Sequence, residues 1–325
     1  MKMKAAIALK PGRLPVYDDF AEPVAEPGEV IVHVTASALS QLARGRAAGH
    51  HYSATGQYPF VVGVDGVGRL DDGRRVYFLL PRSPFGAMAD RTVVKNGQWL
   101  PLPEDLEDST AAVLANPGMS SWAALTQRAR LIDGETVLIN GATGVAGKLA
   151  VWIARHLGAA RVIATGRNEA VLRTIGADAE IPLGEDPEAF EAALHPHLAS
   201  GVHVVLDYLW GASARSILVA AAKACPSGLP LRFVQVGSAA GSEVALPASA
   251  LRSSAIQIMG SGLGSVSVHG LIGAIDGVLQ AAAKARLSLD YRAVPLSDVS
   301  TTWAGEGQRI VYVPNPATVA TGTYR

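Results

Sequence analysis

The middle of the chain alternates short apolar strands with helices, and this alternation most constrains the fold. The predicted strands are Thr136–Asn140, Arg161–Thr165, Val204–Asp207, Leu231–Gln235 and Ile256–Met259. The predicted helices between them are Val145–Leu157, Glu169–Ile175 and Ala212–Ala224. Apolar strands joined by helices are typical of a parallel sheet that is covered on both faces. We therefore predict an α/β fold with a doubly wound parallel sheet of the Rossmann type.

A glycine-rich loop joins the first of these strands to the first helix. Read against the pattern GxGxxG, Ala142, Gly144 and Gly147 hold the three motif positions, with alanine in place of the first glycine. Small residues let backbone N–H groups approach a pyrophosphate at the positive end of the helix. A strand–helix turn without a ligand is the alternative. We predict that a dinucleotide is bound by Ala142, Thr143, Gly144, Val145, Ala146 and Gly147.

The end of the second strand bears on which dinucleotide is bound. An NAD site usually has Asp or Glu about 20 residues after the glycines, where it binds the ribose 2′-hydroxyl. This sequence has Gly166-Arg167-Asn168 there, and no acid before Glu169. The guanidinium of Arg167 can pair with a 2′-phosphate, although a solvated loop arginine is the alternative. We predict NADPH as the cofactor, contacted by Gly166, Arg167 and Asn168.

The segments on either side of this α/β region have other patterns. The first ~100 residues form a β-rich domain with turns at glycine and proline clusters. Its strands are predicted at Val30–Ala36, Phe60–Val64 and Arg75–Leu80. Between the β-rich and α/β regions, Ser109 is predicted to cap one helix and Pro117 to open a second. After about Leu263 the pattern predicts a long alanine-rich helix, a short helix near Thr301–Gly305 and a strand Arg309–Val313.

Charge and cysteine content exclude several classes of function. Lys+Arg and Asp+Glu both total 28, so no basic surplus favours nucleic acid as a partner. Cys225 is the only cysteine, which excludes an internal disulfide and nearly excludes a cysteine-based zinc site. No uninterrupted apolar stretch approaches the ~20 residues that cross a membrane. We expect a cytoplasmic protein that acts on a small molecule.

Several short segments, in their order and spacing, resemble the medium-chain dehydrogenase/reductase superfamily, in its zinc-free quinone oxidoreductase branch. The resemblance covers essentially the whole chain, and its carriers besides the glycine-rich loop are Gly63–Gly68, Asn116–Trp122, Ile175–Asp178, Gln235–Ser238 and Met259–Gly262. It implies a discontinuous GroES-like catalytic domain of residues 1–115 plus 264–325, and a Rossmann nucleotide-binding domain of residues 116–263. It also implies a homodimer in which the Ile256–Met259 strand lies at the sheet edge.

The resemblance also implies roles for individual residues. Ser40 stands where quinone reductases often have an asparagine near the nicotinamide, and Tyr52 lies near the family's usual tyrosine, where His51 competes for the position. Packing or a surface position is the alternative for both. Asp65 could orient site residues, but we expect it to satisfy backbone amides in a turn. Further cofactor contacts are implied for Asn116, Ser120, Val236, Gly237, Ser238, Gly260, Ser261 and Gly262.

The zinc-dependent alcohol dehydrogenases of this superfamily hold their metal with cysteine and histidine. Val64 stands where those enzymes carry histidine, and no thiol lies near Ser37–Ser40. We therefore predict no metal site and a reductase that transfers hydride from NADPH to a quinone or an α,β-unsaturated carbonyl. The alternatives are a zinc-free alcohol or aldehyde oxidoreductase, and a nucleotide-binding protein with a non-catalytic role.

Overall fold

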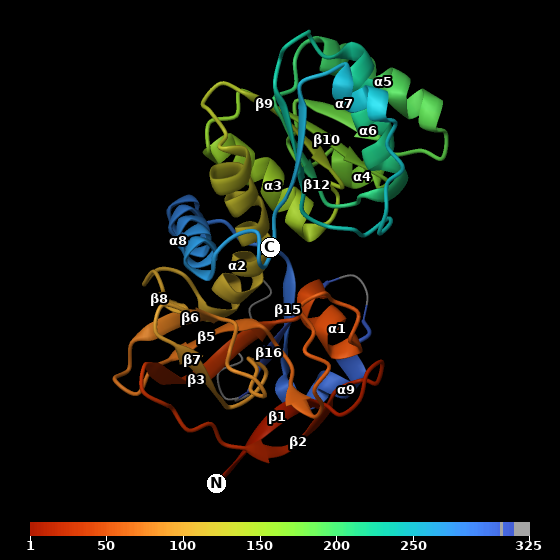
Figure 1. Cartoon of the computed structure of the whole chain (residues 1–325). Helices are drawn as coiled ribbons and strands as arrows, with labels where there is room; N and C mark the ends of the chain where they lie inside the picture. Colours follow the sequence, from red (N-terminus) through yellow and green to blue (C-terminus); the bar gives the residue numbers. More distant parts are fainter. Residues whose placement is uncertain (306–307, 315–325) are drawn as a thin grey trace. The chain divides into compact units, whose positions relative to one another are not determined.

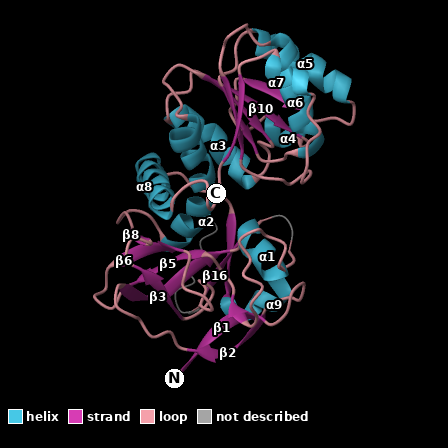
Figure 2. Cartoon of the chain, in the orientation of Figure 1, coloured by secondary structure: helices cyan, strands magenta, loops and turns pink. Residues whose placement is uncertain are grey.

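The computed structural model describes residues 1–305 and 308–314 (Figures 1 and 2). The chain forms two compact units. The first unit contains Met1–Asn116 together with the described residues from Ile275 onward, and the second contains Pro117–Ala274. None of the described helices combines the length and the apolar character that crossing a membrane needs.

The second unit is built on a six-stranded parallel sheet with the order β11-β10-β9-β12-β13-β14. The strands are β9 (Thr136–Asn140), β10 (Arg161–Gly166), β11 (Ala179–Pro182), β12 (Val204–Asp207), β13 (Leu231–Gln235) and β14 (Ile256–Gly260). Counted along the chain, this order is third, second, first, fourth, fifth and sixth, which is the Rossmann arrangement. The predicted fold class is confirmed, and the predicted edge position of the last strand is confirmed as well.

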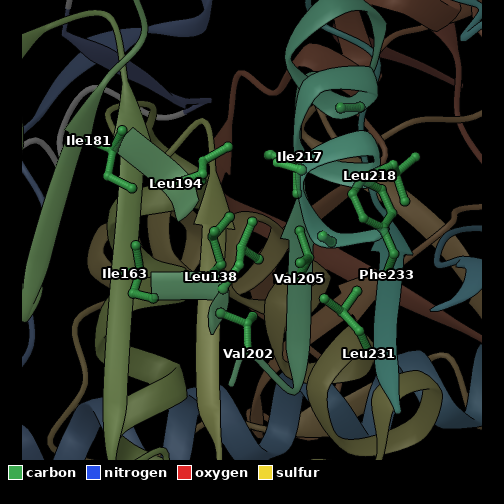
Figure 3. Packing of buried hydrophobic residues seen from close by; sticks show 14 of the residues in the cluster. Leu138, Ile163, Ile181, Leu194, Val202, Val205, Ile217, Leu218, Leu231 and Phe233 are labelled. Carbon is green, nitrogen blue, oxygen red and sulfur yellow. The ribbon is translucent and has the colours of Figure 1, made fainter. Parts of the chain in front are cut away.

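Helices connect these strands and cover the sheet. They are α3 (Val145–His156), α4 (Glu169–Leu172), α5 (Pro187–Ala199), α6 (Gly211–Ala224) and α7 (Ala248–Arg252). Alternate residues of the central strands pack against α5 and α6 in one buried cluster, which includes Leu138, Ile163, Val205 and Phe233 (Figure 3). Complete burial of such a side chain contributes roughly 1.5–3 kcal/mol. The cluster therefore holds the strands in register beneath the loops that follow their carboxyl ends.

The first unit contains two further sheets. Its strands are β1 (Lys2–Ala8), β2 (Val16–Ala21), β3 (Glu29–Ala38), β4 (Phe60–Val61), β5 (Asp65–Arg69), β6 (Arg75–Leu79), β7 (Arg91–Lys95), β8 (Trp99–Pro101), β15 (Tyr291–Pro295) and β16 (Arg309–Val313). One sheet has the order β2-β1-β4, and the other has the order β15-β16-β3-β5-β6-β8, with β7 paired to β3. Strand β16 pairs antiparallel with β3, so the C-terminal segment completes a sheet begun near the N-terminus.

The remaining helices correct two expectations. They are α1 (Gln41–Ala48), α2 (Asp108–Ala123), the π-helix η1 (Ala124–Ala129), α8 (Val268–Ala285), the 3₁₀ turn η2 (Leu296–Asp298) and α9 (Val299–Thr302). The predicted break at Pro117 is wrong, because α2 continues through it. Proline removes one backbone N–H donor, and here the helix tolerates that loss. The short helix predicted near Thr301–Gly305 begins earlier, at Val299.

Candidate functional site

The glycine-rich loop after β9 is bonded to the end of the neighbouring strand β10. Gly141 has φ 90°, a left-handed conformation that favours glycine. The N–H groups of Gly141 and Ala142 both donate to the carbonyl oxygen of Thr165, at 3.1 and 2.8 Å. The chain therefore turns sharply at Gly141 and enters α3 at a fixed position.

Two glycines of this loop serve different purposes. A Cβ on Gly147 would lie 2.3 Å from the carbonyl oxygen of Gly141 and 2.6 Å from the Cα of Ala142, so glycine is required for α3 to pack against the loop. A Cβ on Gly144 would meet no atom closer than 3.9 Å. The space beside Gly144 is therefore open to a ligand.

The first turn of α3 is suited to an anion. Gly144 is the N-cap residue and provides no side-chain hydrogen bond, and the first turn contains no acidic residue. The initial N–H groups of a helix lack intrahelical acceptors and carry partial positive charge. An uncapped helix end beside open space is the arrangement in which proteins bind pyrophosphate. The loop thus fits the predicted dinucleotide.

A buried polar network at the ends of β9, β10 and β12 supports the glycine-rich loop. It was not predicted from the sequence. The Nδ2 atom of Asn140 donates to Asp207 at 2.8 Å and to Ser213 at 3.0 Å. Thr165 donates to the Oδ1 atom of Asn140 at 2.7 Å. Asp207 also accepts from the backbone N–H groups of Leu209 and Trp210, and burial raises its pKa. The available signal was a polar residue at or near the carboxyl end of each apolar strand.

The residue that directly follows β10, Arg167, is a cation that could bind a ligand. Arg167 is exposed, and no hydrogen bond or ion pair joins its side chain to any residue in the described ranges. The acid that follows is engaged elsewhere, since Glu169 pairs with Arg173 at 2.7 Å. Asn168 caps α4 by accepting from the N–H of Val171. The segment therefore presents a free guanidinium.

Gly166 is needed for the approach of the glycine-rich loop to β10. A Cβ at this position would lie 2.5 Å from Cγ2 and 3.0 Å from Oγ1 of Thr143. Any side chain here would push Thr143 away. The two predicted cofactor segments are therefore in direct contact with each other.

The loops that follow β13 and β14, at the carboxyl ends of these strands, are also held by close contacts. A Cβ on Gly237 would lie 2.7 Å from the carbonyl oxygen of Tyr208. The segment Val236–Ser238 therefore packs closely against the loop that follows β12. Arg128 donates to the carbonyl oxygen of Gly260 at 2.8 Å, and the N–H of Ser261 donates to Gln235 at 2.9 Å. The N–H of Gly262 donates to Ser265 at 2.8 Å. These contacts order the loops without occupying the space beside Gly144.

Ser120 lies inside α2 and does not cap it. Its hydroxyl donates to the carbonyl oxygen of Pro117 at 2.7 Å and lies 3.5 Å from the hydroxyl of Tyr208. Burial raises the pKa of Tyr208 to about 12. The Tyr208 hydroxyl therefore stays protonated near neutral pH and is available as a hydrogen-bond donor.

A second buried polar cluster lies in the first unit, around Asp65. Its carboxylate accepts from the Tyr77 hydroxyl at 2.7 Å and from the Nδ2 atom of Asn116 at 3.1 Å. Burial raises the pKa of Asp65 from 3.8 to about 6, against the opposing effect of these bonds and of nearby Arg309. The predicted turn role of Asp65 is wrong, because the residue lies in β5 and its partners are side chains. The Nε and Nη2 atoms of Arg309 are buried and have no hydrogen-bond partner among the residues that the structure describes.

Comparison with known proteins supplies the family. No family model matches the chain. A protein of Emericella nidulans named "Probable NADPH-dependent quinone reductase" is 30% identical over 345 aligned residues, which cover 92% of this chain and 96% of that protein. The chain belongs to the quinone oxidoreductase branch of the medium-chain dehydrogenase/reductase superfamily.

Solved structures agree with this assignment. The quinone oxidoreductase of Thermus thermophilus, reported with its NADPH complex, is 26% identical, with a TM-score of 0.77 over 96% of this chain and all of that one. A Mycobacterium abscessus oxidoreductase is similar in fold, with a TM-score of 0.76 and 24% identity over 97% of this chain and 100% of that one. The predicted resemblance is confirmed.

The two residues that the resemblance suggested for catalysis are in different surroundings in this reductase. Ser40 is buried and caps α1, where its Oγ accepts from the N–H of Ala43 at 3.1 Å. Tyr52 is 70% exposed, and its ring lies 4.3 Å from the ring of His51. The structure places both in the first unit, at the start of α1 and in the loop that follows it. Their roles stay predictions.

Metal-binding side chains are dispersed in the part of the chain that the structure covers. Within residues 1–305 and 308–314, no three or more His, Cys, Asp or Glu side chains are grouped so that they could hold a metal ion. Cys225 is half-buried, and burial raises the pKa of its thiol. A thiol of raised pKa is a weaker nucleophile at neutral pH, which fits a packing role.

The buried carboxyl of Asp65 gives a prediction about pH. Because its pKa is higher in the folded protein than in the unfolded chain, the free energy of unfolding should fall as pH rises from about 4 to about 6. The fall should be at most about 3 kcal/mol. Asp65→Asn removes this titration and keeps both hydrogen bonds possible, so the variant should gain stability relative to the wild type across this range. Urea unfolding of both proteins at a series of pH values measures the difference.

Asp105→Asn is the matched control for this experiment, because Asp105 is an exposed acid in the same unit. Its difference from the wild type gives the effect of removing an exposed carboxylate from this unit. A pH dependence for Asp65→Asn no larger than that for Asp105→Asn would contradict the raised pKa of Asp65.

Proposed function

We propose that the protein is an NADPH-dependent reductase that transfers hydride to a quinone or an α,β-unsaturated carbonyl compound. The observation that carries the proposal is the pair of features at the carboxyl ends of β9 and β10. Gly144 leaves open space at an uncapped helix end, and Arg167 presents a guanidinium without a partner in the described residues. The first feature suits a pyrophosphate and the second a 2′-phosphate.

The chain's residues would bind and orient the cofactor through these groups. N–H groups of the loop Gly141–Gly147 would donate to the pyrophosphate, and Arg167 would pair with the 2′-phosphate. We assign further contacts to Asn116, Ser120, the segment Val236–Ser238 and the segment Gly260–Gly262, as the family resemblance implies. When bound, NADPH supplies the hydride, and the protein supplies orientation and exclusion of water.

A conjugated acceptor suits a site without a Lewis acid. Hydride addition to an electron-poor carbon moves the electron pair onto a carbonyl oxygen through conjugation, and a proton then completes the quinol or ketone product. We propose Ser40 as a hydrogen-bond donor in this site, because its Oγ donates to no described residue. The exposed hydroxyl of Tyr52, or water, would deliver the proton.

Turnover measurements test the proposal directly. The purified full-length protein is expected to oxidise NADPH with naphthoquinones or enones, and to do so far more slowly with simple aldehydes and ketones, whose developing alkoxide is not stabilised by conjugation. Absorbance of NADPH over a panel of acceptors measures the rates. Tight NADPH binding without turnover of any conjugated acceptor would leave only a non-catalytic role, and faster turnover of aldehydes would favour the alcohol dehydrogenase alternative.

Three finer features belong to the same proposal. We infer that activity does not need zinc, since cysteine is nearly absent from the chain, and dialysis against a chelator should leave the rates unchanged.

We infer a homodimer formed through the edge strand β14, where Ile258 is 41% exposed. A monomeric mass in solution would contradict that. We place the enzyme in the cytoplasm, where a chain with one cysteine and no internal disulfide is common.

A further inference from the structure

A shallow hollow in the first unit contains a positive charge that the proposed function does not use. It is open to solvent, and about 490 Å³ of space, open solvent included, lies within its bounds. Its lining includes the α1 residues Ala43 and Arg46, the loop after α1 and the segment around the Ser83–Pro84 bond. Ser40, Ala43 and Arg46 follow one another at intervals of three, so the hollow begins about one helical turn from the proposed site residue Ser40.

The lining of the hollow is mixed, with somewhat more polar than apolar surface. Phe60, Val64, Pro81, Pro84 and Phe85 supply the apolar surface. Thr55 and Ser83 add hydroxyl groups, while the Tyr58 hydroxyl is already used in donating to the carbonyl oxygen of Ala47 at 2.9 Å. No acidic side chain among the described residues lines the hollow. Arg46 is therefore the only charged residue of the described chain in its wall.

Arg46 has no counter-ion in the described part of the chain. No side-chain hydrogen bond or ion pair joins it to residues 1–305 or 308–314, and burial lowers the pKa of its guanidinium. The neighbouring His51 supplies no negative charge, and burial and the Arg46 charge both lower the pKa of its imidazole. A half-buried cation loses hydration, and this loss is usually offset by a paired anion.

We propose that Arg46 selects substrates that carry a carboxylate or sulfonate group, so that the preferred acceptor is an acidic quinone or an acidic enone. The guanidinium would form paired hydrogen bonds to the two oxygens of the anion. The aromatic and aliphatic wall would contact the carbon skeleton of the acceptor. That the bound anion is a substrate rests on the proposed reductase function. That an anion binds here rests on the hollow and on the charge of Arg46.

Equilibrium binding tests the charge selection without turnover. Levulinate and methyl levulinate share one keto-acid skeleton, but the ester replaces the negative charge with a methyl group, and neither is a conjugated acceptor. Isothermal titration of the full-length protein is expected to show that levulinate binds more tightly than its ester. Arg46→Gln should weaken levulinate binding about 10- to 100-fold, as expected for a charge-assisted hydrogen bond, and change ester binding less than about 3-fold.

Two further variants make the result specific. Arg46→Lys keeps the charge without the paired geometry and should recover part of the affinity. Arg44→Gln removes a positive charge from the same helix, but that side chain bonds to the carbonyl oxygen of Gly305 and does not line the hollow. It should leave levulinate binding unchanged. Equal loss in Arg44→Gln and Arg46→Gln would reduce the effect to general electrostatics and overturn the proposal.

Turnover separates this inference from the proposed function. The wild type should reduce a naphthoquinone sulfonate at a lower KM than the parent naphthoquinone, and Arg46→Gln should remove that difference. If both quinones are reduced with equal KM values and levulinate does not bind, the reductase proposal stands and the anion site fails. If levulinate binding depends on Arg46 while no quinone or enone is reduced, the anion site stands and the reductase proposal fails.

Discussion

Replacing Gly147 with alanine is expected to destabilise the second unit and to lower the affinity for NADPH by at least about 100-fold. The added methyl group would lie 2.3 Å from the carbonyl oxygen of Gly141, and both close contacts are with backbone atoms. Backbone cannot rotate away as a side chain can, so either α3 or the loop must move. Overpacking of this kind costs about 1–3 kcal/mol. Urea unfolding and fluorescence titration with NADPH measure the two effects.

Gly144→Ala is the matched control, three residues earlier in the same loop. Its nearest neighbour would be 3.9 Å away and its φ is −78°, so alanine fits without strain. We expect a stability within about 1 kcal/mol of the wild type, which is the usual cost at an N-cap, but weaker NADPH binding, because the methyl group fills the space proposed for the pyrophosphate. Unchanged NADPH affinity in Gly144→Ala would place the pyrophosphate elsewhere. Wild-type stability in Gly147→Ala would show that the loop is loosely packed.

The centre of the sheet could be predicted from the sequence because its strands are largely buried. Strands β9, β12 and β13 have the predicted bounds, since each is a short, mainly apolar run between turns. Strand β11 and helix α5 were not predicted. The segment Ala179–Pro182 is too short for a clear pattern, and Pro196 inside α5 obscures the helical period. A hydrophobic pattern predicts a strand or a helix only where it is repeated over several residues.

The polar clusters could not be predicted in this way, because their partners are far apart in the sequence. Asp65 meets Tyr77 and Asn116 only after β5, β6 and α2 have packed, and nothing near Asp65 in the chain indicates those contacts. The same is true of Asn140 and Asp207, which are brought together by the pairing of β9 with β12. The loop residues were predictable for the opposite reason, since a glycine required by a close backbone approach is visible as a glycine.

Arg167 is expected to determine the choice between NADPH and NADH. The residue follows Gly166 at the end of β10, where an acid would otherwise bind a ribose hydroxyl. Its exposed side chain loses little hydration until a phosphate binds, so its pairing with a 2′-phosphate should be favourable but limited by solvent screening. A charge-assisted hydrogen bond contributes about 1.5–3 kcal/mol, which corresponds to roughly 10- to 150-fold in affinity.

The expected result is therefore a loss of NADPH affinity of about 10- to 100-fold in Arg167→Ala, with NADH affinity changed less than about 3-fold. Arg167→Glu should go further, because a carboxylate repels the 2′-phosphate and can accept from a ribose hydroxyl, so the preference should reverse toward NADH. Arg173→Ala removes a nearby exposed cation that already pairs with Glu169, and should affect neither cofactor. Titration of each variant with both cofactors at several salt concentrations measures these changes. Equal loss of NADPH and NADH in Arg167→Ala would assign the guanidinium to the shared part of the dinucleotide and not to the 2′-phosphate.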